Sequence, residues 1–239
     1  MHPKVSTMLI VLVLISTGCA YAAPLQPRVA AVENVESGSP AAPTAPAPVP
    51  NEPAPPVDSA PEKLEPIVLT LSVYILDDAT GDSSSARTAE ELADVYKKAN
   101  DIWSQAGIVL EVQTITRTNV SSIYLEAIAG RDFSHFFSGV RGGEIEIPDP
   151  SLLNGFYAQD IGGPNGITPF GSRVFFVTDA PSVHSERVSS HEVGHILGLH
   201  HVLDDQNRLM FPGTNGMRLS DQEIRVARYA AQGLLAGVR

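Results

Sequence analysis

The stretch HEVGHILGLHH, residues 191–201, decides how the rest of the chain is interpreted, because it holds four of the seven histidines. On a helix, His191 and His195 lie one turn apart on the same face, with Cβ atoms about 5–6 Å apart. Both imidazoles can then bind one tetrahedral zinc ion. Glu192 lies beside the first of them, where its carboxylate cannot comfortably join the same ligand set. It can instead take a proton from a zinc-bound water and return it to a leaving amine.

Gly198 decides which further histidine completes this site. A residue without a Cβ can adopt a positive φ, end the helix and turn the chain back, so that His201 supplies a third nitrogen. Three neutral imidazoles leave a fourth position for water, as a catalytic zinc site requires. Two alternatives are His200 as the third ligand and a helix whose histidines are only core or surface residues. We expect Ser189 or Ser190 to cap the start of this helix.

Residues 191–201 resemble the motif H-E-x-x-H-x-x-G-x-x-H of the metzincin metalloproteases. The resemblance implies one catalytic zinc ion and His201, rather than His200, as its third ligand. It also implies a Met-turn downstream, in which Met210 forms an apolar floor beneath the three histidines.

The residues Leu209-Met210-Phe211-Pro212 resemble the Met-turn of matrixin-like members of this family. Pro212 stands where the astacin and serralysin types have a tyrosine, so no tyrosine ligand is expected. Val202 departs from the serine that usually follows the third histidine in matrixins. The resemblance further implies that one wall of the substrate pocket is formed by Phe211, Pro212, Gly213 and Thr214.

The flanking sequence predicts an α/β (α+β) fold with a twisted mixed sheet. An apolar, β-branched run at 67–76 predicts a buried strand. Thr88 and Glu91 form a capping box for a long helix that ends before Gly107, and a second strand at 108–115 is expected to run parallel to the first. The resemblance adds an active-site helix, a Met-turn and a C-terminal helix, and Ser220 with Glu223 predicts the start of the latter.

The middle of the chain, 117–171, is harder to order. Residues 121–129 predict either a short helix or a strand, 144–147 a brief edge strand, and 155–171 a turn-rich segment. A strand is expected at 172–178, and its part Val174–Thr178 is a candidate edge for aligning a substrate as an added strand.

The N-terminal third differs in composition from the rest. Residues 1–23, with the apolar run Met8–Ile15, predict an export signal cleaved after Ala22 or Ala23. A rival interpretation is a lipoprotein box in which Cys19 becomes a lipid anchor. Residues 24–66 contain 12 of the 19 prolines and predict a disordered Pro/Ala-rich linker, or less favourably an inhibitory pro-segment. The catalytic domain is expected at 67–239.

Charge and cysteine content narrow the possible functions. The net charge of −11, without a basic run, argues against nucleic acid as a partner. A single cysteine excludes a disulfide framework or a cysteine-based zinc site within the chain. Asp160 lacks the neighbouring carboxylates of a calcium loop, which leaves structural calcium undecided.

Together these features predict an exported, monomeric zinc endopeptidase, secreted or periplasmic, acting on a peptide or protein substrate. A non-catalytic zinc- or peptide-binding module of the same fold and a cell-wall peptide hydrolase are the alternatives.

Overall fold

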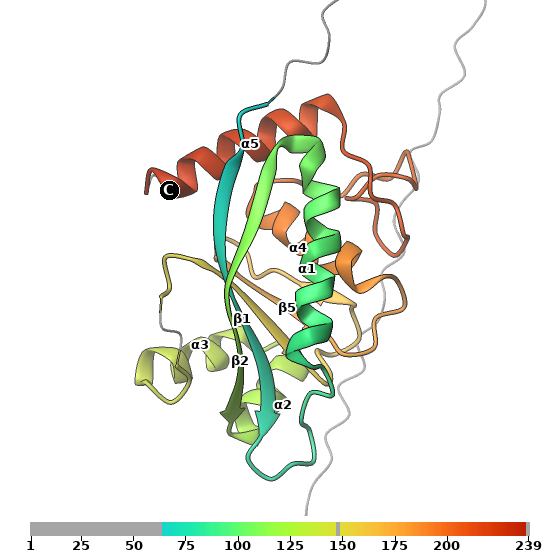
Figure 1. Cartoon of the computed structure of the whole chain (residues 1–239). Coiled ribbons are helices and arrows are strands. Elements are labelled where there is room, and N and C mark those ends of the chain that lie inside the picture. The colour runs from blue at the N-terminus through green and yellow to red at the C-terminus, as the bar shows by residue number, and fades with distance from the viewer. Residues whose placement is uncertain (1–63, 147–148, 238–239) are drawn as a thin grey trace, which may run out of the picture. The chain divides into compact units, whose positions relative to one another are not determined.

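The computed structural model describes residues 64–146 and 149–237 (Figure 1). The predicted export signal, Cys19 and the linker as far as residue 63 lie outside the described residues. No helix within the described part is long and apolar enough to cross a membrane.

A mixed sheet forms the centre of the fold, which confirms the predicted α/β class. Within the described residues it has five strands in the order β2-β1-β3-β5-β4. All neighbouring strands are parallel except β4, which is antiparallel to β5 at one edge. The strands are β1 (Ile67–Asp78), β2 (Ile108–Val120), β3 (Leu153–Ala158), β4 (Gly166–Ile167) and β5 (Val174–Thr178).

The first strand-helix-strand unit has the predicted order, but both strands extend beyond the expected residues, and only one of the two hydrogen bonds of the expected capping box is found among the described residues. Helix α1 (Ala89–Trp103) follows Thr88, whose side chain accepts a hydrogen bond from the backbone N–H of Glu91. A 3₁₀ turn, η1 (Ser104–Ala106), then ends at Gly107 with φ 59°. The left-handed conformation of this glycine turns the chain directly into β2, which pairs in parallel with β1.

Alternate residues of β1 enter two separate apolar cores, because successive side chains of a strand point to opposite faces. Val73 and Ile75 face the core that contains α1, helix α4 (Ser185–Ile196) and helix α5 (Asp221–Leu235). Tyr74 and Leu76 face a second core under α2 (Ser122–Ala129) and α3 (Phe133–Gly142). Helices therefore cover both faces of the sheet, with α1 and α4 packed together on one of them.

The middle of the chain departs from the sequence-based expectation at several points. Residues 121–129 form a helix, α2, and the helix α3 was not anticipated. The prediction of an edge strand at 144–147 is wrong for residues 144–146, which the structure describes. Gly143 ends α3 with φ 75°, and the backbone N–H groups of Glu144 and Ile145 both bind the carbonyl of Gly139, which leaves them in the helix terminus rather than a ladder.

The segment 155–171 is also more ordered than expected, because its start belongs to the central strand β3. Gly155 is a site of close packing and not a turn: a Cβ there would lie 2.6 Å from Cζ of Phe175. The candidate substrate-aligning strand Val174–Thr178 is not at the edge either. It lies between β3 and β4, so the edge of the sheet next to it is β4.

Candidate active site

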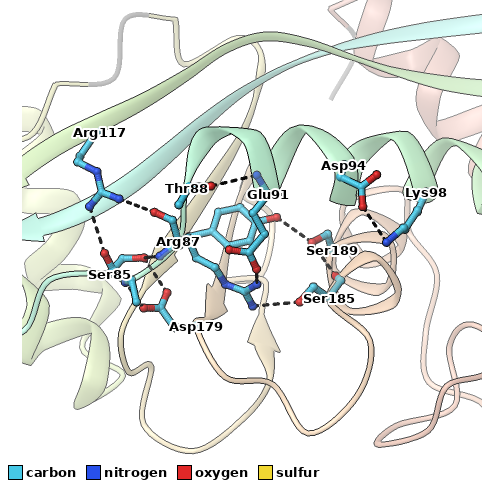
Figure 2. Close-up of polar contacts among 12 residues, drawn as sticks. Ser85, Arg87, Thr88, Glu91, Asp94, Lys98, Arg117, Asp179, Ser185 and Ser189 are labelled. Atoms are coloured by element: carbon cyan, nitrogen blue, oxygen red, sulfur yellow. Dashed lines mark hydrogen bonds and ion pairs between the residues drawn. The ribbon is translucent and has the colours of Figure 1, made fainter.

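Helix α4 carries the histidine motif and is held against α1 by polar contacts as well as apolar ones. Figure 2 shows that Arg87, just before α1, pairs with Glu91 and donates from Nη2 to the hydroxyl of Ser185 at 3.0 Å. Deeper in the fold, the Tyr157 and Ser189 hydroxyls lie 2.8 Å apart, which joins β3 to α4. These contacts fix the helix in place.

The start of α4 differs from the expectation. The helix begins at Ser185 with His184 as its N-cap residue, so neither Ser189 nor Ser190 caps it. Both serines are fully buried inside the helix, one turn or more after its start. The apolar residues that bury this helix therefore begin before the histidine motif, with Val188.

Three imidazoles converge beside this helix, those of His191, His195 and His201. Nε2 of His201 lies 3.1 Å from Nε2 of His191 and 3.2 Å from Nε2 of His195. On the far side of two rings, Nδ1 of His191 lies 2.8 Å from the carbonyl oxygen of Leu209, and Nδ1 of His195 lies 3.0 Å from that of Leu199. A carbonyl can only accept, so the proton is on Nδ1 and the Nε2 lone pairs are free to bind a metal.

The electrostatic environment keeps these imidazoles neutral. Burial lowers the pKa of His191 to about 3, against the opposing effect of its hydrogen bond to Leu209. Burial likewise lowers the pKa of His195 and of His201. Three neutral imidazoles, two of them of fixed tautomer, lie close enough to share one ion and match the ligand set of a catalytic zinc site.

Gly198 allows the third histidine to reach the other two. Its φ is 78°, and the backbone N–H of Leu199 donates to the carbonyl of Gly194, so the helix ends and the chain reverses. His201 enters the cluster as a result. The adjacent His200 is exposed and lies outside the cluster, although it lines the same cleft.

Met210 lies under the histidines, fully buried. A Cβ at Gly194 would lie 2.7 Å from the Met210 sulfur, so the Met210 side chain packs against the helix between the two histidines. The preceding residue, Leu209, supplies the carbonyl that orients His191. The Met-turn expected from the sequence is therefore in direct contact with the candidate metal ligands.

Glu192 lies beside this cluster and is 4% exposed. The Thr168 hydroxyl lies 2.9 Å from its Oε2 and 3.0 Å from its backbone oxygen, and can donate to one of them at a time. A Cβ at Gly166, in β4, would come within 2.6 Å of Oε1, so β4 and the carboxylate are in close contact. Burial raises the pKa of Glu192 to about 7, opposed by the Thr168 hydrogen bond and by the charge of Arg187. A bound cation would favour the ionised carboxylate.

The histidines and Glu192 open into a cleft of about 890 Å³ between α4 and the segment 163–173 that contains β4. Of the four residues expected to form a pocket wall, Pro212 and Gly213 line this cleft. Phe211 directs its carbonyl to Arg187, and the Thr214 hydroxyl donates to the carbonyl of Gln206 at 2.9 Å.

Among the cleft residues that the sequence analysis missed, Arg187 and Thr168 contact the candidate site through hydrogen bonds. Arg187 lies four residues before His191, a helical spacing that puts both on one face and could have revealed it. Thr168 lies in a loop beside a two-residue strand, and no local pattern points to it.

The adjacent histidines at 200 and 201 offer a matched test of the metal site. We expect His201→Ala to weaken zinc binding by more than about 100-fold, since even the loss of an outer hydrogen-bond partner costs 10–100-fold. His200→Ala removes the same side chain one residue away and should bind zinc as the unaltered protein does. Competition with a chromogenic zinc chelator measures both affinities. Equal zinc affinities for the two variants would contradict the assignment.

Comparisons with known proteins give only remote similarity. No family model matches the chain, and no curated protein matches it. Among solved structures, metalloproteinase-II from Bacteroides fragilis is 14% identical with a TM-score of 0.43, over 72% of this chain and 55% of that chain. A structure of a chaperone–substrate complex is 14% identical with a TM-score of 0.46, over 74% of this chain and 36% of that chain. The chain thus spans about half the length of the first of these proteins and about a third of the second.

Proposed function

We propose that the protein is a zinc-dependent endopeptidase of the metzincin type, matrixin-like in its Met-turn, and that it is exported. The observation that carries the proposal is that three neutral imidazoles converge beside the buried carboxylate of Glu192, which is not part of the candidate ligand set. A purely structural zinc site closes with a fourth protein ligand, whereas a catalytic one keeps a position open and places a base next to it.

The residues of the chain divide the work of peptide hydrolysis between them. His191, His195 and His201 would hold the zinc, which when bound polarises a carbonyl and lowers the pKa of a water. Glu192 accepts the proton of the attacking water on a carboxylate oxygen and donates it to the leaving amine. Thr168 orients that carboxylate by its hydrogen bond to Oε2.

The edge strand β4 gives a site for aligning the peptide. Its residues Gly166 and Ile167 pair with β5 on one side, and both line the cleft. An extended peptide can add to the other side of β4 by main-chain hydrogen bonds, which brings its backbone beside Glu192. Strand β4 therefore takes the place of Val174–Thr178 as the proposed strand for aligning the substrate.

Metal removal tests the proposal. We expect the full chain with zinc to cleave an unfolded protein such as casein, to lose this activity when a chelator removes the metal, and to regain it on addition of zinc. Calcium or magnesium should not restore it, because imidazole ligands favour zinc over these ions. Elemental analysis of each sample shows how much zinc it holds. Cleavage that persists without metal would contradict the proposal, and bound zinc with no cleavage of casein or of a peptide library would favour a binding module.

A further inference from the structure

A buried arginine lies in the cleft next to the metal cluster. Arg187 is 3% exposed, yet it is one of the residues that line the cleft. Its Nη2 donates to the carbonyl of Leu209 at 2.8 Å and also to that of Phe211. Its Nε is buried and has no hydrogen-bond partner among the described residues. The guanidinium is therefore held by the Met-turn backbone through Nη2, while its buried Nε has no acceptor in the part of the chain that the structure describes.

Within the described part of the chain the Arg187 guanidinium forms no direct ion pair, and the negative charge that acts on it is that of Glu192. None of the ion pairs found there includes Arg187. Glu192 is the one acidic residue lining the cleft, against Arg173 and Arg187. The cleft is thus cationic in a protein whose net charge is −11. A buried charge without a directly bonded partner is costly, so a ligand that places a carboxylate within hydrogen-bond distance of it gains affinity here.

Arg187 and the candidate metal ligand His191 share one hydrogen-bond acceptor, which places Arg187 near the site of cleavage. The Leu209 carbonyl accepts from both Nη2 of Arg187 and Nδ1 of His191. The guanidinium is therefore one carbonyl group away from a candidate metal ligand. We therefore expect a substrate group that reaches Arg187 to belong to a residue close to the bond that is cleaved.

We propose that Arg187 binds a substrate carboxylate beside the scissile bond, so that the enzyme prefers substrates with an acidic group at that position. This inference rests on the proposed peptidase function. The carboxylate can come from an aspartate or glutamate side chain or from the C-terminus of the peptide. A fixed guanidinium suits either, because a charge-assisted hydrogen bond forms with both.

Peptide cleavage by the unaltered protein gives the first test. A library of amidated peptides should show kcat/KM roughly tenfold to a hundredfold higher with Asp or Glu than with Asn or Gln at one position next to the scissile bond, the range of one hydrogen bond to a charged group. A second set, without acidic side chains, compares free with amidated C-termini. A preference in the first set identifies a side chain, and one confined to the second set identifies the terminal carboxylate. Neutral peptides cleaved as well as acidic ones in both sets would overturn the proposal.

Variants separate the charge of Arg187 from its structural contacts. Arg187→Gln keeps an N–H donor for the Leu209 carbonyl but removes the charge, and the ratio of acidic to neutral kcat/KM should fall to near one. Arg187→Lys keeps the charge and should retain most of the preference. Arg225→Gln removes the same charge from an exposed site on α5 and serves as the control. An unchanged ratio in Arg187→Gln would overturn the proposal.

A binding measurement distinguishes failure of this inference from failure of the proposed function. The Glu192→Gln variant with zinc can be titrated with a fluorescent acidic peptide and its amide counterpart. Tighter binding of the acidic peptide supports the role of Arg187 even if no peptide is turned over. Equal binding of the two, with active cleavage by the unaltered protein, leaves the peptidase proposal standing and removes the one on Arg187.

Discussion

Glu192→Gln is expected to lower kcat for peptide cleavage by about 1000-fold or more, since general acid–base catalysis contributes 10²–10⁴-fold. The amide fits the same space and can keep a hydrogen bond with Thr168, but it cannot accept the proton of the attacking water. Zinc binding should be unchanged, because the three nitrogen donors of the cluster belong to histidines. The measurement is steady-state cleavage of a quenched peptide together with zinc content of the same sample.

Glu186→Gln is the matched control. Glu186 is on the same helix, in its first turn, and does not line the cleft. Both variants replace a glutamate by a glutamine. Glu186→Gln should cleave peptides at the normal rate. Comparable losses in both variants, or normal turnover in Glu192→Gln, would contradict the role of Glu192 as the base.

The sequence predicts those parts of the fold whose signal is local. Thr88 caps α1 by a bond to a residue three positions on, and Ser220 with Glu223 forms a complete capping box for α5. Gly198 ends the active-site helix with a positive φ, as its spacing from the histidines requires. Each of these features depends on residues within one or two turns, so the pattern in the chain is sufficient.

The parts that the sequence does not predict depend on distant contacts. The sequence places Gly155 in a turn-rich segment, but it lies in a central strand, where the Phe175 ring and the Tyr96 hydroxyl occupy the space that a side chain would need. The order of the strands, with β3 inserted between β1 and β5, is likewise a property of the sheet and not of any one segment. The edge strand β4 has only two residues, too few for a periodic pattern.

The same division applies to the site. The three histidines, Glu192 and Met210 come from a short motif, and the structure brings them together. Thr168 reaches Glu192 across 24 positions of sequence, and only the fold relates them. Arg187 is an intermediate case: its spacing from His191 is visible in the sequence, but its burial without a direct ion pair among the described residues is not.

The largest structural effect expected from a change away from the metal is that of Gly216→Ala. Gly216 is buried against the segment that leads into the Met-turn: a Cβ there would lie 2.4 Å from the carbonyl oxygen of Gln206 and 2.5 Å from that of Arg208. These are backbone atoms, so no side-chain rotation relieves the overlap. We expect the free energy of unfolding to fall by about 3 kcal/mol, at the upper end of the usual overpacking cost. Urea denaturation of the metal-free protein measures it.

Gly216→Ala should also lower the affinity for zinc, which a general loss of stability would not do. The N–H of Leu209 donates to the carbonyl of Arg218, two residues after Gly216, at 2.8 Å, and the carbonyl of Leu209 orients His191. Displacing this segment disturbs that hydrogen bond, so zinc affinity should fall about tenfold or more. Gly142→Ala, whose nearest Cβ neighbour would be 3.6 Å away at the exposed end of α3, should leave both quantities nearly unchanged. If Gly216→Ala is destabilised but binds zinc normally, His191 does not depend on the Leu209 carbonyl for its orientation.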